Sequence, residues 1–289
     1  MRKNNTLWGY IFLTPQLLGL IAFALIPLCF AFVLSFMNWD GFGAKTFIGL
    51  DNFMGQFKNP VFWKALWNTV LYTILYIPVG ITLSMVLAIA LNKIRGKELY
   101  RIFFFMPVIT SSVSVGVIWM WILNGDFGIL NQFLANFGID GPQWLTDTRW
   151  VMVSIAILSI WWQLGYNMVI FLAGLQGISS SYYEAAEIDG ASKFQKFRHI
   201  TLPLLSPTTF FVTIMAIIGS FQVFDQAFVM TSGGPAKASY TLVYHIYETA
   251  FINFRMGESS AAAMILFVII LIFTLIQFRV SKRWVHYEG

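Results

Sequence analysis

Hydrophobic residues are gathered in long runs without charged side chains, and the charged residues are confined to the segments between these runs. Each run is long enough for a helix that crosses a hydrocarbon core of about 30 Å, which needs roughly 20 residues. The runs without Asp, Glu, Lys or Arg are 4–39, 65–92, 102–125, 150–183, 200–224 and 259–278. The pattern predicts six transmembrane helices, at about 10–37, 66–92, 103–124, 151–175, 203–225 and 259–280.

The composition supports a membrane protein. The chain is 58% hydrophobic and 11% charged, whereas about a quarter of the residues of a soluble domain are charged. The first apolar run is too long for the core of a signal peptide, so we expect it to remain as a helix. The single cysteine, Cys29, excludes a disulfide framework. We therefore expect an all-α integral membrane protein with one transmembrane domain over residues 1–289.

Basic residues are distributed unevenly between alternate loops. The two termini and the segments 93–101 and 193–198 together hold 12 of the 18 Lys and Arg residues, and the other loops hold the remaining six. Because basic residues favour the cytoplasmic side, both termini are predicted to be cytoplasmic. These charges lie at helix ends and form no predicted patch on a folded face, so the net charge of +5 does not indicate a nucleic-acid partner.

The segment 179–203 has the pattern of a structured loop. Ser181 and Glu184 have the spacing of a capping box, which begins a helix. Gly190 can adopt the left-handed conformation that ends a helix. Ser192 can then cap a second short helix, and Pro203 suits the first turn of the next span. The sequence therefore predicts two short helices at a sharp bend on the cytoplasmic face.

The same segment resembles the EAA signature of ABC importer permeases, with Glu184-Ala185-Ala186, Gly190 and Ile200-x-Leu202-Pro203 at fixed offsets. Further motifs, such as Phe104-x-Met106-Pro107 and the run 231–235, resemble the maltose-type sugar permeases in the expected order. The resemblance implies a type I ABC importer permease fold, in which the loop 179–203 is the coupling helix that docks on a cytoplasmic ATPase. It assigns this coupling to Glu184, Ala185, Ala186, Asp189, Gly190, Ile200, Leu202 and Pro203.

The resemblance also implies the partners and the location. It implies import of a sugar or oligosaccharide across a bacterial or archaeal cytoplasmic membrane, with an external binding protein, two ATPase subunits and a second, related but different permease. The chain has no GxxxxGK[ST] phosphate loop, so we expect ATP and Mg²⁺ to be bound by the partner ATPase and this chain to be no enzyme. We expect no cofactor or metal, because none of the three histidines is spaced with another as a metal pair.

Several alternatives remain open. Within the same machinery, the substrate could be glycerol phosphate, although an anion would favour basic side chains along its path and the predicted spans contain none apart from Arg279 at the end of the sixth. A secondary transporter could have this helix count, but ion coupling usually needs ionisable groups inside the membrane. Only Asp225, at the end of the predicted fifth helix, approaches this description. Glu184 could act only as a cap of its own helix.

Two helix faces are candidates for the substrate path. On the fourth predicted helix, Trp161, Leu164, Gly165 and Met168 share one face, where Gly165 is expected to leave an open notch. On the fifth predicted helix, the small residues include Gly219, Ser220 and Val223. The competing interpretation places the sugar on the amides of Gln163, Asn167 and Gln222. Close helix packing would explain the small-residue faces equally well.

Overall fold

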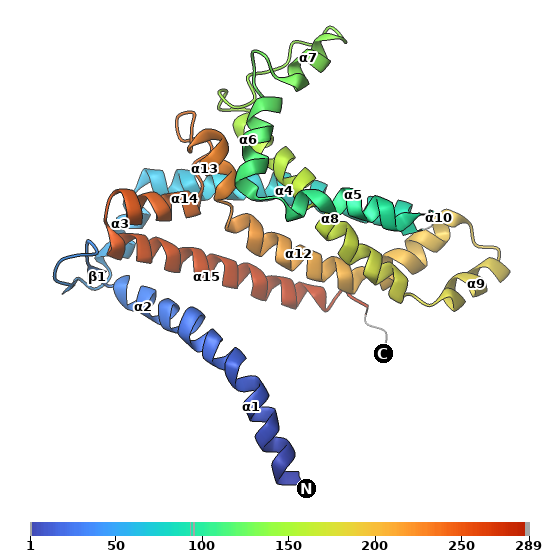
Figure 1. Cartoon of the computed structure of the whole chain (residues 1–289), viewed down its shortest axis with the longest axis horizontal. Coiled ribbons are helices and arrows are strands. Elements are labelled where there is room, and N and C mark those ends of the chain that lie inside the picture. The colour runs from blue at the N-terminus through green and yellow to red at the C-terminus, as the bar shows by residue number, and fades with distance from the viewer. Residues whose placement is uncertain (1, 93, 95, 287–289) are drawn as a thin grey trace. The chain divides into compact units, whose positions relative to one another are not determined.

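The computed structural model describes residues 2–92, 94 and 96–286, and the regular elements of this part of the chain are helices apart from one short antiparallel ladder (Figure 1). Four helices are long and apolar enough to cross a membrane, and two bent helix pairs raise the number to six if each pair counts as one span. The unbroken candidates are Tyr10–Leu34, Pro60–Asn92, Val151–Gly177 and Met256–Ser281. Each predicted span corresponds to one of these helices or bent helix pairs, and two of the predicted helices are broken.

The first predicted helix, 10–37, is observed as α1 (Arg2–Leu20), a π-helical segment η1 (Ile21–Leu25) and α2 (Ile26–Leu34). The change of hydrogen-bond pattern comes just before Pro27, which has no N–H to donate to a helical ladder. The second span is α4 (Pro60–Asn92) and the fourth is α8 (Val151–Gly177), and both begin and end near their predicted positions.

The third predicted helix, 103–124, is corrected to two helices, α5 (Lys97–Ile109) and α6 (Ser112–Ile122), which meet at an angle of 97°. Pro107 cannot donate a backbone hydrogen bond, and its carbonyl accepts both the Thr110 N–H at 3.1 Å and the Trp162 indole N–H at 2.8 Å. Thr110 and Ser111 are then extended. The break follows because the ladder at Pro107 is interrupted by a bond from another helix.

The fifth predicted helix, 203–225, is also corrected. Before it, α9 (Ser180–Ile188) is followed by a continuous run of α10 (Lys193–Lys196), η2 (Phe197–Thr201) and α11 (Leu202–Leu204). This run bends by 59° into α12 (Ser206–Phe221). Pro207, in the first turn of α12, has no N–H, and the Pro203 carbonyl accepts instead from the Ser206 hydroxyl at 2.5 Å.

The helix α12 ends at Phe221, earlier than predicted, and a new short helix begins at Asp225 after the Gln222–Phe224 turn. The remaining elements complete the chain. They are β1 (Met37–Asn38), β2 (Thr46–Phe47), α3 (Asp51–Lys58), α7 (Ile129–Ala135), α13 (Asp225–Thr231), α14 (Leu242–Tyr247), η3 (Glu248–Ile252) and α15 (Met256–Ser281).

The chain divides into two compact units. The first holds the residues up to Phe62 together with 245–268. Inside it, the side chain of the fully buried Gln56 forms hydrogen bonds with two other side chains. Its Oε1 accepts from His245 Nε2 at 2.9 Å, and its Nε2 donates to Glu258 Oε1 at 3.2 Å. Since buried polar groups are stable only when they are hydrogen-bonded, this network fixes α3 against the beginning of α15.

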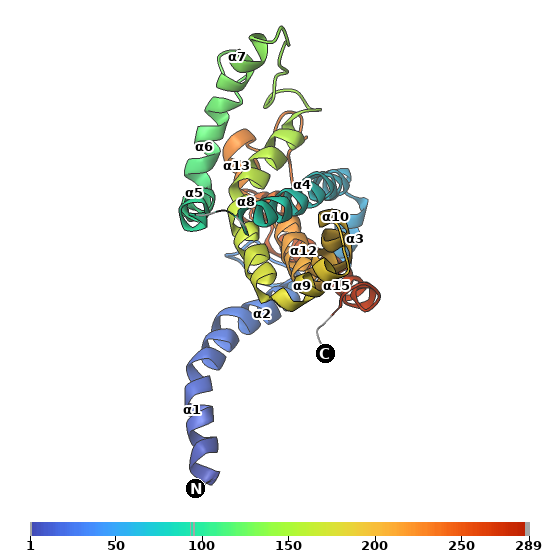
Figure 2. The same cartoon turned by 90° about the vertical axis from the view of Figure 1, so that its right-hand side faces the viewer.

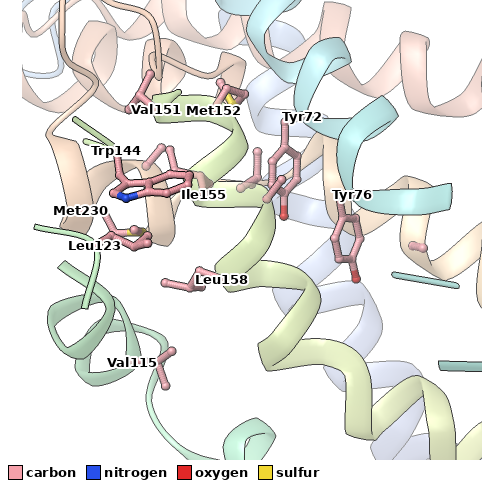
Figure 3. Packing of buried hydrophobic residues seen from close by; sticks show 14 residues of the cluster. Tyr72, Tyr76, Val115, Leu123, Trp144, Val151, Met152, Ile155, Leu158 and Met230 are labelled. Atoms are coloured by element: carbon pink, nitrogen blue, oxygen red, sulfur yellow. The ribbon is translucent and has the colours of Figure 1, made fainter. Parts of the chain in front are cut away.

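The second unit holds residues 63–244 and the residues from 269 onward. In it, α5 packs along α8, and α6 packs along α13, as both views show (Figures 1 and 2). Its largest apolar cluster joins residues of α4, α6, α8 and α13, including Tyr72 and Tyr76, whose rings are stacked 5.6 Å apart with their hydroxyls pointing the same way (Figure 3). The α9–α10 segment and α13 lie at opposite ends of α12 in Figure 1.

Candidate functional site

The helix α9 begins at a different serine from the one predicted. Ser179 is the N-cap, with extended backbone and a side chain that accepts a hydrogen bond from the Ser181 N–H. Ser181 therefore lies in the first turn, and the predicted capping box with Glu184 is not formed. Glu184 is exposed, and no hydrogen bond or ion pair involves its side chain among the described residues. Its carboxylate is thus free to meet a partner.

The turn between α9 and α10 has the predicted geometry. Gly190 has φ +76°, a left-handed conformation that L side chains rarely adopt. The Ala191 N–H returns to the Ala186 carbonyl at 2.8 Å. Ser192 and Gln195 then form a complete capping box, in which Gln195 Oε1 accepts from the Ser192 N–H at 2.7 Å. Two short helices at a sharp bend result.

Two side-chain contacts hold these helices together in what we name the α9–α10 hairpin, residues 179–203. Lys196 Nζ lies 2.5 Å from Glu187 Oε1. The Tyr183 hydroxyl lies 3.0 Å from Thr201 Oγ1, which ties α9 to the π-helical segment. Because both contacts lie across the bend, the hairpin is fixed on the run that leads into α12 and is more than a flexible connection.

The hairpin exposes two large apolar side chains that the sequence analysis did not select. Ile188 is 87% exposed and Phe194 is 68% exposed. The predicted coupling residues differ in setting: Ala185 and Asp189 are exposed, whereas Ile200, Leu202 and Pro203 are half-buried in the helical run. The signal for Ile188 was available as an apolar residue at the end of an otherwise polar helix.

A second feature is a cavity of about 390 Å³ between α4, α8 and α12, which we name the helix cavity. Its walls combine apolar side chains with hydroxyls, amides and one carboxylate. Among the residues that the structure describes, none that lines it is a lysine or an arginine. The lining consists of Tyr72, Tyr76, Ser159, Trp162, Gln163, Tyr166, Asn167, Met215, Ala216, Gly219, Ser220, Gln222, Val223, Phe224, Asp225 and Gln226.

Hydrogen bonds hold several of these groups in place. The Tyr72 hydroxyl interacts with the Ser159 side chain and the Tyr76 hydroxyl with the Asn167 side chain, so α4 and α8 share two polar contacts. The Thr73 hydroxyl lies 3.0 Å from that of Ser220 on α12. By contrast, neither Gln163 nor Gln222 forms a side-chain hydrogen bond with another described residue. Their amides remain able to donate to and accept from a bound polyol.

The structure separates the two predicted faces. Gly219, Ser220 and Val223 line the helix cavity, and so do the amides of the competing interpretation. The residues Trp161, Leu164, Gly165 and Met168 do not line it.

The notch expected at Gly165 is occupied. A Cβ atom there would lie 1.8 Å from the Phe104 carbonyl oxygen, so α5 fills the space that glycine leaves. Met168 is fully buried in an apolar cluster, and the Trp161 ring packs against Trp119 at 5.6 Å. Gly165 therefore serves close helix packing, as small residues in membrane helices commonly do.

The helix α4 also lines the helix cavity, and none of its residues was predicted from the sequence. Tyr72 and Tyr76 stand one turn apart on the same face of that helix. A pair of hydroxyl-bearing aromatic residues four positions apart within a span was the signal that could have found them.

Helices that are long and apolar enough to cross a bilayer, with a polar cavity among them and a folded hairpin beside them, fit the membrane-spanning component of a transport system. The chain belongs to the family described as "Binding-protein-dependent transport system inner membrane component", whose model matches residues 80–286. It is therefore a multi-pass inner-membrane protein and a transport component without catalytic activity of its own.

Relatives are similar over nearly their whole length. The chain is 39% identical to the probable ABC transporter permease protein YesP of Bacillus subtilis (strain 168), with 100% of this chain and 94% of that protein covered. It is 36% identical to the sn-glycerol-3-phosphate transport system permease protein UgpA of Agrobacterium fabrum (strain C58), with 98% of each covered. It is 37% identical to the lactose transport system permease protein LacF of Rhizobium radiobacter, with 93% and 91% covered.

A solved structure shares the fold. A chain of a bacterial ABC transporter involved in the import of the acidic polysaccharide alginate superposes with a TM-score of 0.83 at 23% identity, covering 97% of this chain and 96% of that one. The type I importer permease fold that the sequence implied is thereby confirmed. The secondary transporter that the helix count had left open is rejected by the family membership.

Proposed function

We propose that the chain is a permease subunit of an ABC importer for an uncharged sugar or oligosaccharide. The observation that carries this proposal is the lining of the helix cavity, in which amides and tyrosine hydroxyls surround apolar side chains without any lysine or arginine among the described residues. Sugar rings offer hydroxyls for such amides and C–H faces for the apolar walls. The face of Gly219, Ser220 and Val223 and the amides of Gln163 and Gln222 form the substrate path.

Import of glycerol 3-phosphate is the second candidate, favoured by the similarity to UgpA. The phosphate would bring negative charge into a cavity whose charged lining residue is Asp225. Like charges repel strongly where water is scarce, so this cavity disfavours a phosphate ester. We therefore place the uncharged sugar first.

The α9–α10 hairpin is the part that couples transport to ATP hydrolysis. Glu184, Ala185, Ala186, Asp189 and Gly190 form its free end, with Ile188 as an exposed apolar contact. Two cytoplasmic ATPase subunits would bind ATP and Mg²⁺, and the helical run with Ile200, Leu202 and Pro203 would carry their movement into α12. The exposed carboxylate of Glu184 fits a basic residue of the ATPase.

The remaining partners and the orientation follow from the same assignment. A second permease of related but different sequence would complete the path, and an external binding protein would deliver the sugar. Both termini and the hairpin are assigned to the cytoplasm by the distribution of Lys and Arg.

The test is transport by the complete complex in proteoliposomes, with uncharged mono- to tetrasaccharides and glycerol 3-phosphate as substrates. We expect at least one sugar to stimulate ATP hydrolysis and to accumulate, and glycerol 3-phosphate to do neither. Import of glycerol 3-phosphate without import of any sugar would contradict the proposed substrate class. Failure of the chain to purify with an ATPase would contradict the coupling role.

A further inference from the structure

A second cavity, of about 500 Å³, lies between the C-terminal end of α6, the loop that precedes α8, and the C-terminal end of α13. We name it the loop cavity. Its apolar walls include Met120 and Met230, and its polar groups include Asn124, Asp126, Gln143 and Thr146. A cavity of this size with apolar walls and a few convergent polar groups has the character of a small-molecule site.

The polar groups offer both donors and acceptors. Asn124 uses its Oδ1 to accept the backbone N–H groups of Asp126 and Phe127, at 2.9 and 3.1 Å. Its Nδ2 forms no hydrogen bond with another described residue. Asp126 Oδ1 accepts from Gln143 Nε2 at 2.9 Å, and its other oxygen is free of bonds within the described chain. Vicinal hydroxyls, which donate and accept at once, suit such a set.

Other ligand classes fit less well. Hard cations such as Ca²⁺ need six or more oxygen ligands, often from several carboxylates, and Asp126 is the single acidic residue among the lining residues. No cluster of three or more His, Cys, Asp or Glu side chains suited to a metal occurs in the described part of the chain. An anion would be repelled by the same carboxylate. An uncharged polyhydroxylated ligand remains.

The Gln143 side chain is held over a glycine. A Cβ atom at Gly125 would lie 1.8 Å from Gln143 Oε1, so only glycine allows the amide to occupy this position. The loop after α13, which supplies Gly234 and Pro235 to the lining, is also held: Asn68 of α4 donates to the carbonyls of Lys237 and Tyr240 at 2.8 and 3.0 Å. The cavity is therefore preformed, which lowers the entropic cost of binding.

The two cavities share α13 as a common wall. Asp225 and Gln226, at its beginning, line the helix cavity, whereas Val229 to Ser232, at its end, line the loop cavity. Seven helical residues rise by about 10 Å at 1.5 Å each, a length comparable to that of a disaccharide. Beside α13, the Ser112 hydroxyl of α6 donates to Asp225 Oδ2 at 2.6 Å, so α6 keeps this wall in place.

We propose that the loop cavity is a second carbohydrate site, which holds one end of an oligosaccharide while the other end enters the helix cavity. This inference rests on the proposed import of a sugar and deepens it. A monosaccharide occupies one cavity at a time, but a chain of three or more units contacts both. The loop cavity therefore selects for chain length.

The experiment compares Gln143→Ala with wild type in the complete reconstituted complex, with glucose, lactose, maltotriose and arabinotetraose as substrates. Gln132→Ala is the matched control, because its amide lies on the nearby helix α7 and donates to the Phe127 carbonyl but does not line the cavity. Gly125→Ala is the second variant, which displaces the Gln143 amide without removing it. Co-purification of the ATPase checks that each variant assembles.

Both cavity variants are expected to lower uptake of the tri- and tetrasaccharide about tenfold, as for the loss of one or two hydrogen bonds, with glucose and lactose unchanged. A loss that is equal for all chain lengths, or none, would overturn the loop cavity as a carbohydrate site. The proposal would also be overturned if the unloaded binding protein associated more weakly with the Gln143→Ala complex than with wild type. That result would make the loop cavity a protein-docking surface. If wild type imports no sugar of the series, the proposed function fails, and this proposal fails with it.

Discussion

The ammonium nitrogen of Lys196 lies 2.5 Å from Glu187 Oε1 and so joins the second helix of the α9–α10 hairpin to the first. The lysine side chain is 17% exposed and the glutamate 66% exposed. One partner is thus shielded from solvent, which strengthens the pair compared with a fully exposed one. Together with the Tyr183–Thr201 contact, it joins the first helix of the hairpin to the helical run that follows the bend.

Glu187→Gln is therefore expected to loosen the hairpin and to lower transport per ATP hydrolysed. In a double-mutant cycle with Lys196→Met, the interaction energy should be about 0.2–1 kcal/mol, as for partly exposed ion pairs. The measurement is sugar uptake against phosphate release in proteoliposomes. Glu184→Gln serves as the contrast, since its exposed carboxylate is proposed to bind the ATPase and its loss should reduce ATPase co-purification instead. Additive effects of the Glu187 and Lys196 variants would show that the pair is irrelevant to coupling.

Gly190→Val is expected to disrupt the turn while the membrane helices stay folded. The residue has φ +76°, a conformation that costs an L residue about 1–2 kcal/mol and a β-branched one more, and no atom lies within 4 Å of the added Cβ. The damage is thus confined to the backbone of the turn. The ATPase should be lost from the purified complex, whereas the thermal stability of the permease in detergent should be unchanged.

Gly177→Val is the control for this experiment, because Gly177 also has open space around it but does not have a positive φ. It should retain the ATPase. Normal uptake by Gly190→Val would be incompatible with the proposed docking role of the turn.

Gly165→Ala should destabilise the protein itself, in contrast to what the sequence alone suggested. The new methyl group would collide with the backbone of Phe104, so α5 and α8 must separate. Overpacking of this kind costs about 1–3 kcal/mol, which should appear as a lower melting temperature and yield. Gly219→Ala, with nothing within 4 Å of its Cβ, should have the melting temperature and the yield of the wild type. Equal stability of the two variants would exclude the close contact.

The long apolar helices were predictable because a hydrocarbon core excludes charge, so each run without charges corresponds to a helix or a bent helix pair long enough to cross it. The bend at 110–111 could not be predicted in this way. It depends on the hydrogen bond from the Trp162 indole to the Pro107 carbonyl, and these two residues are far apart in the sequence. The same limit applies to the candidate site. A helical projection shows that Gly165 and Trp161 share a face, but only the packing of α5 shows that this face is covered. The Gly190 turn depends on local backbone preferences, and it was therefore predicted correctly.

Gln163→Ala is expected to lower sugar uptake by about tenfold, and Trp161→Ala by much less, because Gln163 lines the helix cavity and Trp161 does not. Loss of one hydrogen bond to a sugar hydroxyl corresponds to a change of this order. Initial uptake rates over a range of loaded binding protein would measure it. If Trp161→Ala lowered uptake more than Gln163→Ala did, in complexes of normal stability, the substrate path would lie on the Trp161 face of α8 instead.

A tag inserted after Gly138 is expected to be extracytoplasmic, and one after Lys282 cytoplasmic, as the distribution of Lys and Arg indicates. Gly138 lies in the loop between α7 and α8 with open space around it, so an insertion there should be tolerated. Accessibility to an impermeant maleimide in intact cells, with single cysteines at these positions and Cys29 replaced by Ser, gives the same information. Detection of both tags on one side would refute the topology.

The bend of 59° between the α10–α11 run and α12 means that a movement along the first helical run is not parallel to the axis of α12. If the α10–α11 run moves along its own axis, about half of that displacement is directed along the axis of α12. The larger component is perpendicular to α12 and displaces this helix sideways. Since α12 lines the helix cavity with Gly219 and Ser220, a small advance of the hairpin would change the width of the cavity more than its depth. A straight helix at the same position would only slide along its own axis.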